Sequence, residues 1–171
     1  MAEKDLVKAS GFNLPISTKH AIELCMFMKG KEVSKIKDTL HKVIEEKAVI
    51  KLKRFYHKRG HKKGHLGPGF YPKKASLHFL NLLKTLEGNA RNKGLNSESL
   101  QIDKAITNQA SLSWHYSRHR GRRQKRTNVE IYAFEKQKKP DSKKVPSASK
   151  ESPKKSLGEA SSKEGSKEVK K

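Results

Sequence analysis

Hydrophobic residues recur at steps of three and four positions in three segments of the chain, residues 16–30, 32–48 and 72–93. Because this spacing places apolar side chains on one side of an α-helix, we expect three helices, each with one face in a core. The apolar positions that define these faces are Ala21, Leu24, Cys25, Met28, Val33, Ile36, Leu40, Val43, Ile44, Ala75, Phe79, Leu83, Leu86 and Ala90.

The first and third of these segments also carry residues that are typical of helix ends. Ser17 is an N-cap candidate whose side chain can accept a hydrogen bond from an exposed N–H, and Pro72 suits the first turn of the third helix. Gly30 and Gly94 follow the two helices at positions where a left-handed residue would end them.

After the third segment the hydrophobic period changes to two, which is typical of strands. The first alternating run covers residues 97–121. A second alternating run, residues 127–135, carries Val129, Ile131 and Ala133 on one side. Gly121 lies between the runs, and we expect it to make the turn with a positive φ, so that residues 100–135 form an antiparallel hairpin. The side of the first run that is expected to be apolar consists of Leu100, Ile102, Ile106, Leu112, Trp114 and Tyr116. The opposite side consists of Thr107, Gln109, Ser111, Ser113 and Ser117.

The length of the hairpin predicts that its far half protrudes. A returning strand over residues 123–135 would span roughly 40 Å at about 3.3 Å per residue, more than a small helical body can cover. The outgoing run is longer than the returning one, so we expect a bulge or an irregular tip. An isolated two-stranded ribbon is marginal in water, and a protruding one needs an external partner.

These patterns predict an α+β fold, a small three-helix domain packed on an antiparallel sheet with a protruding hairpin. We expect this domain to occupy residues 1–135. Residues 136–171 are rich in Lys, Ser, Pro and Glu and contain no aromatic residue. Such a composition cannot bury enough apolar area to offset its ordering entropy, so we expect a disordered basic tail.

Charge indicates what kind of partner the protein has. The 171 residues carry a formal net charge of +23, and only 33% of them are hydrophobic, enough for one modest core. A charge of this size opposes a compact fold unless a polyanion neutralises it. No apolar run approaches the roughly 20 residues of a membrane-spanning helix, so we expect a soluble intracellular protein.

Candidates for reaction or metal chemistry are few. Cys25 is the only cysteine and lies on the apolar face of the first helix, so we interpret it as a buried core thiol. His57, His61 and His65 are four residues apart, but the surrounding cations would repel a divalent ion. A phosphate-binding loop is the better interpretation of this segment, and Gly67–Gly69 reads as a turn. No catalytic motif is present, so we expect no enzyme, no cofactor and no metal.

Two segments concentrate positive charge without acidic residues, namely 47–74 and 104–129. Arginine forks match phosphate oxygens, and aromatic rings stack on unpaired bases, so the second segment indicates a nucleic-acid contact. Trp114 and Tyr116 can alternatively form a cross-strand aromatic cluster, and a bare basic run can be a nuclear localisation signal. The cations of this segment that cluster around Gly121 are Arg118, Arg120, Arg122, Arg123, Lys125 and Arg126.

Several motifs in fixed order, chiefly "YPKKA", "GNARNKGL" and the basic hairpin "RHRGRRQKRTNVEI", carry a resemblance to a known family. Over roughly residues 11–135 the chain resembles the universal large-subunit ribosomal protein family twenty-two, called L seventeen in older eukaryotic naming. The resemblance implies a domain on large-subunit ribosomal RNA beside the peptide exit tunnel, with the hairpin running along the tunnel wall. The basic insert before the third helix looks archaeal or eukaryotic, and we expect a eukaryotic protein.

The resemblance also implies RNA contacts at the positions that match the family's motifs. These positions are Lys19, His20, Lys53, Arg54, Tyr56, Asn89, Arg118, His119 and Arg122, and Gly121 falls on the same hairpin motif as the last three. From charge and aromatic content we add further RNA-binding candidates, which are His57, Lys58, Arg59, Lys62, Lys63, Lys73, Lys74, Trp114, Tyr116, Arg120, Arg123, Lys125 and Arg126. The residues expected to line the tunnel are His119, Arg120, Gly121, Arg122, Arg123 and Gln124.

The expected partners are large-subunit ribosomal RNA, neighbouring ribosomal proteins near the exit tunnel and the nascent polypeptide, without a membrane or a homo-oligomer. The expected location is the cytoplasmic ribosome, after assembly in the nucleus or nucleolus. The alternative that the residues leave open is a free RNA- or chromatin-binding regulator with the same charge.

Overall fold

The computed structural model describes residues 6–64 and 66–136, and it contains the three predicted helices. They are α1 (Thr18–Met28), α2 (Val33–Ile44) and α3 (Lys73–Asn92), each slightly shorter than its predicted segment. Periodicity located the helices correctly because each has a continuous buried face.

The helix ends agree only in part with the sequence prediction. Gly30 and Gly94 adopt φ values of 77° and 74°, which confirms them as left-handed stops. Ser17 is the N-cap residue of α1, but its side chain makes no capping hydrogen bond. Pro72 is the N-cap residue of α3 and thus lies one position before the first turn.

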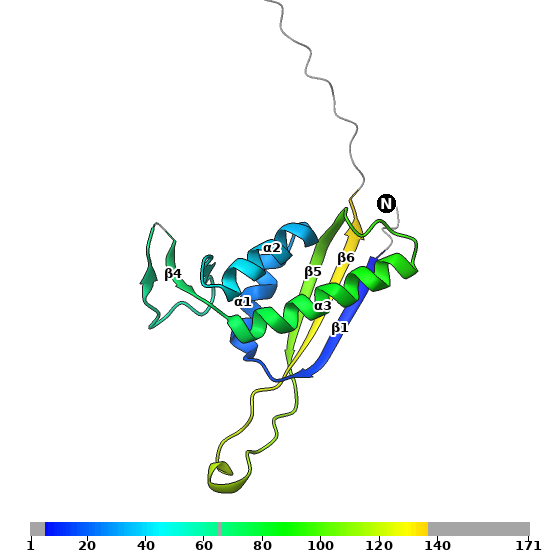
Figure 1. Cartoon of the computed structure of the whole chain (residues 1–171). Helices are drawn as coiled ribbons and strands as arrows, with labels where there is room; N and C mark the ends of the chain where they lie inside the picture. Colours follow the sequence, from blue (N-terminus) through cyan, green and yellow to red (C-terminus); the bar gives the residue numbers. More distant parts are fainter. Residues whose placement is uncertain (1–5, 65, 137–171) are drawn as a thin grey trace, which may run out of the picture. The chain divides into compact units, whose positions relative to one another are not determined.

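The main sheet has three antiparallel strands in the order β1-β6-β5 (Figure 1). They are β1 (Leu6–Leu14), β5 (Leu100–Gln109) and β6 (Thr127–Glu135). β1 was not predicted, although Val7 and Ala9 alternate with polar neighbours and are buried. α1 packs on β5, α3 packs on β1, and α2 packs on α3.

A bulge in β5 changes which side chains face the helices. Ile102 pairs with Ala133 and Lys104 pairs with Tyr132, so Asp103 is an extra residue in β5. The extra residue reverses the alternation, and the predicted apolar side is therefore wrong beyond Ile102. Ile106 is 40% exposed. The bulge itself was expected from the unequal lengths of the two runs.

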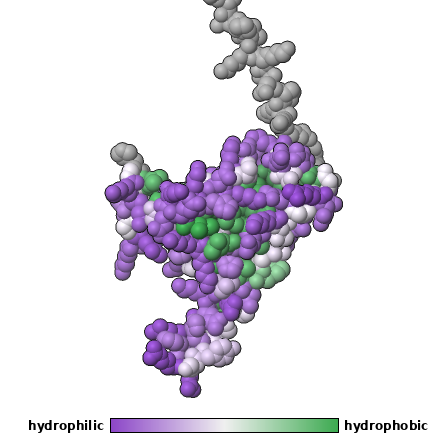
Figure 2. Space-filling view, viewed as in Figure 1, coloured by the Kyte–Doolittle hydropathy of each residue, from purple (hydrophilic) through white to green (hydrophobic). Residues whose placement is uncertain are grey.

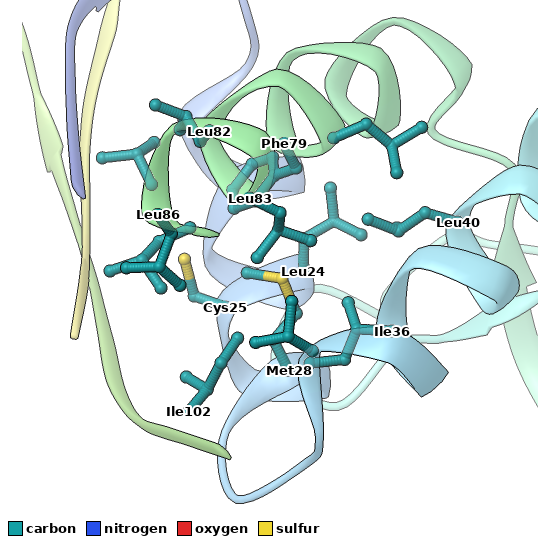
Figure 3. Close-up of a cluster of buried hydrophobic side chains, with 14 of the residues drawn as sticks. Leu24, Cys25, Met28, Ile36, Leu40, Phe79, Leu82, Leu83, Leu86 and Ile102 are labelled. Atoms are coloured by element: carbon teal, nitrogen blue, oxygen red, sulfur yellow. The ribbon is translucent and has the colours of Figure 1, made fainter. Parts of the chain in front are cut away.

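The core lies between the helices and the sheet (Figure 3). Phe79, Leu83 and Leu86 of α3 are fully buried, as is Ile102 of β5. Cys25 is buried there as predicted, and its Sγ lies 2.8 Å from Thr107 Oγ1. Burial raises the pKa of the Cys25 thiol to about 11 against the opposing hydrogen bond with Thr107, which favours the interpretation of Cys25 as a structural core residue.

A second, small sheet organises the basic segment between α2 and α3. Its strands, in the order β2-β4-β3, are β2 (Ile50–Lys51), β4 (Gly67–Phe70) and β3 (His61–Lys62). The prediction of a turn at Gly67–Gly69 is wrong, because these residues lie in β4 and pair with both neighbouring strands. Phe70 is buried and anchors β4 to the core.

Lys136 is the last described residue, so the predicted disordered tail lies otherwise outside the described residues and stays a prediction. Within residues 6–64 and 66–136, no helix has the length and apolar character that a bilayer span requires.

Candidate nucleic-acid interface

The basic loop, residues 53–63, is held in place from inside the protein. Glu23 of α1 is only 2% exposed, and its carboxylate accepts hydrogen bonds from three successive backbone N–H groups of this loop. The donors are the N–H groups of Lys53, Arg54 and Phe55, at 2.9, 2.8 and 2.7 Å. Glu23 was not singled out from the sequence, although an acid beside Leu24 on a mostly apolar helix is an available signal.

The basic loop, the first turn of α1, the start of α3 and the returning side of the hairpin surround one hollow of about 870 Å³. The hollow is lined by the aromatic side chains of His20, Phe70 and Tyr71. The cations that line it come from segments far apart in the sequence and are Arg59, Lys62, Lys73, Lys74 and Lys125. The fold thus gathers predicted RNA-binding residues around a single concave surface.

Lys125 also connects this hollow with two smaller ones. It lines a hollow of about 520 Å³ with Lys19, Arg54 and Lys58, and another of about 500 Å³ with Arg123. We call the three together the cationic surface. Sequence reasoning predicted its members separately, but the central place of Lys125 follows from the fold.

His20 lies at the centre of the cationic surface and is half-buried. Its ring centroid is 4.7 Å from that of Phe70. Burial lowers the pKa of His20, and the positive charges of Arg59 and Lys125 lower it further. Both effects favour the neutral form of His20, which offers a ring to stack on and one acceptor nitrogen rather than another positive charge.

The part of the hairpin beyond the main sheet, residues 110–126, is called the hairpin arm. It leads away from the sheet beyond β5 and β6 (Figure 1), which confirms the predicted protrusion. The Ala110 N–H donates to the Arg126 carbonyl, and the His115 N–H donates to the Arg122 carbonyl. Trp114 and Arg123 form an isolated bridge. The two sides of the arm are thus joined at a few points rather than by a regular ladder.

The turn at the tip differs from the prediction. Residues 117–119 form one turn of 3-10 helix, and Ser117 adopts the left-handed conformation with φ 57°. Gly121 is not among the residues with a positive φ, so the prediction that it makes the left-handed turn is wrong. The irregular tip itself was expected.

The arginines of the hairpin arm have no carboxylate partner in the described part of the chain. The ion pairs found there join other residues, such as Lys8 with Glu130 and Lys37 with Glu87. No residue of the arm is buried, and hydrophilic residues cover most of it (Figure 2). These cations are therefore available to an external polyanion.

The two aromatic residues of the arm are exposed, Trp114 by 53% and Tyr116 by 86%. The guanidinium of Arg123 lies 4.7 Å from the Trp114 ring centroid, so the cross-strand neighbour of Trp114 is a cation. The alternative of a Trp114–Tyr116 cluster is wrong, since no ring contact joins these two residues among the described ones. Both rings remain open to stacking on bases.

Several predicted RNA-binding residues have partners within the protein. Asn89 Nδ2 donates to the Lys8 carbonyl at 2.9 Å, which ties α3 to β1. Lys73 pairs with Glu46 at 2.7 Å, and the Tyr56 ring centroid is 4.3 Å from that of His57. Their RNA contacts stay predictions, as does that of the exposed Lys63.

The structure does not test the histidine triplet as a whole, because one of its members is not described; among the described residues, no three His, Cys, Asp or Glu side chains are grouped to hold an ion. His57 and His61 are exposed, whereas His65 lies outside the described residues. His57 lines the hollow that contains Lys58, and His61 lines the hollow of about 870 Å³ beside Lys62.

Comparison with known proteins shows which family the chain is similar to. The family model for "Ribosomal protein L22p/L17e" matches residues 9–131, which include most of β1, the basic loop and the whole hairpin arm. The chain is 40% identical over 102 residues to the large ribosomal subunit protein uL22 of Archaeoglobus fulgidus, covering 58% of this chain and 66% of that protein. The match to the Methanocaldococcus jannaschii protein of the same name has 40% identity and covers 59% and 66%.

The chain thus spans just under two thirds of the length of these two relatives. A longer match joins it to the uL22 protein of Methanoculleus marisnigri, with 34% identity over 139 residues, 77% of this chain and 91% of that protein. Because the family model matches well over half of the chain, the chain belongs to the ribosomal protein L22p/L17e family.

Proposed function

We propose that this protein is a structural component of the large ribosomal subunit, and that it binds ribosomal RNA through the cationic surface and the hairpin arm. The observation that carries the proposal is the set of arm arginines without a carboxylate partner among the described residues, on a chain of this family. RNA phosphates would supply the missing counter-charge. The relatives bear names of the large ribosomal subunit, and the family is structural rather than enzymatic.

The finer part of the proposal concerns the tip. Residues 119–124 line the peptide exit tunnel, next to neighbouring ribosomal proteins and the nascent polypeptide. The protrusion of the arm, the absence of buried residues in it and its exposed cations support this placement. We also propose a eukaryotic protein that is assembled into subunits in the nucleolus and acts in the cytoplasm, although the relatives named above are archaeal.

Sedimentation of a cell lysate through a sucrose gradient tests the proposal. The expected result is that the full chain comigrates with large subunits and stays there after a high-salt wash, because an integral component has contacts beyond surface charge. Recovery only in light fractions would contradict the proposal and favour a free RNA- or chromatin-binding regulator. Salt sensitivity alone does not separate the two, since both make many phosphate contacts.

A further inference from the structure

Glu23 is an acid buried within a strongly cationic protein, beside the surface that we assign to RNA. It lies in the middle of α1 and is 2% exposed. No cation forms an ion pair with it in the described part of the chain. A buried carboxylate is costly unless hydrogen bonds compensate it. The compensating donors here are backbone groups of the basic loop.

The three hydrogen bonds form a cradle around the carboxylate. Oε1 accepts from the N–H groups of Arg54 and Phe55, and Oε2 accepts from that of Lys53, all between 2.7 and 2.9 Å. Successive N–H groups that converge in this way form a binding site for an anion. The carboxylate of Glu23 is the anion that occupies this cradle.

The loop has few other internal restraints near this point. The Leu52 N–H donates to the Pro68 carbonyl at 3.0 Å, which is the last backbone hydrogen bond before the cradle. Beyond the cradle, the Arg59 N–H donates to the Tyr56 carbonyl within the loop. The backbone N–H groups of residues 53–55 are thus bound by one side chain of α1, that of Glu23, while Lys19 of α1 contacts only the Phe55 ring, with its Nζ 5.6 Å from the ring centroid.

The cradle lies between two groups of cations that follow one another along α1. Lys53 lines a hollow of about 320 Å³ together with Lys29 and Lys31. Arg54, the next residue, lines the cationic surface beside Lys19. The three N–H groups bound to Glu23 thus mark the point where the chain passes along α1, from the hollow beside its C-terminal half to the hollow beside its first turn.

We propose that Glu23 is a positioning residue for RNA binding: its carboxylate fixes the backbone of residues 53–55 and thereby places Arg54 and its neighbours on the cationic surface. This inference rests on the proposed function and deepens it. Glu23 itself is buried and does not touch RNA, so it acts only through the loop.

The test compares two substitutions of buried residues on α1 in the full chain. Glu23→Ala removes the cradle's acceptor, whereas Cys25→Ala removes a buried side chain that packs toward Thr107 on β5. Amide hydrogen exchange should show deprotection at Lys53, Arg54 and Phe55 in Glu23→Ala, with α3 unchanged. Formate, which fits the vacated carboxylate position, should restore the protection. Loss of protection throughout the core in Glu23→Ala, with no response to formate, would overturn the proposal.

Binding to purified large-subunit ribosomal RNA is then measured over a range of salt concentrations. We expect Glu23→Ala to bind about tenfold more weakly than the parent chain, which corresponds to the removal of about one charge-assisted interaction. The slope of log K against log salt should fall by about 2 if the displaced loop leaves two phosphates without a cation. Glu23→Gln, which keeps one acceptor oxygen, should lie between the parent and Glu23→Ala.

Three outcomes of the binding experiment are informative. Weaker binding by Glu23→Ala but not by Cys25→Ala, recovered with formate, supports the positioning role. If Glu23→Ala and Cys25→Ala lose equal RNA affinity and equal thermal stability, Glu23 only stabilises the fold. If the RNA affinity of Glu23→Ala is unchanged although its loop is deprotected, the loop does not touch RNA. Both results overturn the inference. Failure of the parent chain itself to bind the RNA would instead refute the proposed function.

Discussion

The same two chain segments form both the most buried and the most exposed parts of the hairpin. Within the main sheet, Val129, Ile131 and Ala133 of β6 have no exposed surface and lie between β1 and β5. Beyond the sheet, the hairpin arm has no buried residue, and only a few hydrogen bonds join its two sides. The two parts differ because β1 and the helices cover β5 and β6, whereas in the arm only the base, residues 123–126, lies beside α1 and β1.

The buried part of the hairpin contributes to the stability of the protein, whereas the exposed arm is a part that we propose to bind RNA. The sheet and helices are stabilised by apolar burial, which needs no partner. A two-stranded ribbon without a covering layer is marginal in water, and the arm adds repulsion among its cations. We therefore expect the stability of the body and the RNA affinity of the arm to respond to different substitutions.

The largest effect on the body is expected from a cavity in the core. Phe79 of α3 has no exposed surface, and Phe79→Ala should lower the free energy of unfolding by about 3–5 kcal/mol. Denaturant unfolding followed by circular dichroism measures it. Leu77 on the same helix is 52% exposed, so Leu77→Ala should change stability by less than about 0.5 kcal/mol. Similar losses in the two variants would contradict the assignment of the core.

Substitutions in the arm are expected to weaken RNA binding without lowering the stability of the body. Changing Arg118, Arg120 and Arg122 together to Gln should weaken binding to large-subunit ribosomal RNA by about ten- to a hundredfold. The slope of log K for RNA binding against log salt concentration should fall by about 0.9 for each phosphate that the arm no longer neutralises. The midpoint of thermal unfolding should stay the same or rise slightly, because mutual repulsion is reduced. Filter binding and differential scanning calorimetry measure the two quantities.

A matched control removes the same charge from the helices. The exposed Lys42, Lys84 and Arg91 lie on α2 and α3, and their replacement by Gln should reduce RNA affinity less than the triple change in the arm. Equal losses would show that RNA responds to net charge alone. The distinction between arm and body would then not hold for binding.

A smaller effect is expected from the exposed ring of the arm. Trp114→Ala should weaken subunit incorporation by about 1–3 kcal/mol, the contribution of one stacked base, whereas Ser113→Ala should have little effect. Ser113 Oγ lies 3.2 Å from Gln124 Oε1 on the opposite side of the arm, and the removal of this exposed hydrogen bond should cost little. Incorporation is measured by quantifying each variant in purified large subunits. Equal incorporation of the two variants would contradict stacking by Trp114.

The sequence was sufficient for the helices and for the existence of the hairpin, because both have long periodic patterns. It was not sufficient for β2, β3 and β4, each two to four residues long, since so short a strand has no readable period. The bulge at Asp103 depends on how two distant strands pair, and one extra residue was enough to reverse the predicted face at Ile106.

The candidate site also has one part that the sequence predicted and another that it did not. Charge and aromatic content identified the residues of the arm and the basic loop, because these are properties of the local sequence. The cradle at Glu23 joins positions 30 to 32 residues apart, and Lys125 meets α1 and the basic loop only in the folded chain. Contacts of this kind leave no local pattern and require the tertiary structure.

The smallest expected effect concerns the turn at the tip of the arm, where prediction and structure disagree. Ser117 adopts a left-handed φ of 57°, which costs a non-glycine residue about 1 kcal/mol or more, so Ser117→Gly should increase amide protection at His115, whose N–H donates across the arm. A Cβ at Gly121 would meet no atom within 4 Å, and Gly121→Ala should leave this protection unchanged. Loss of protection in Gly121→Ala would instead mean that Gly121 makes the turn, as its place in the sequence indicates.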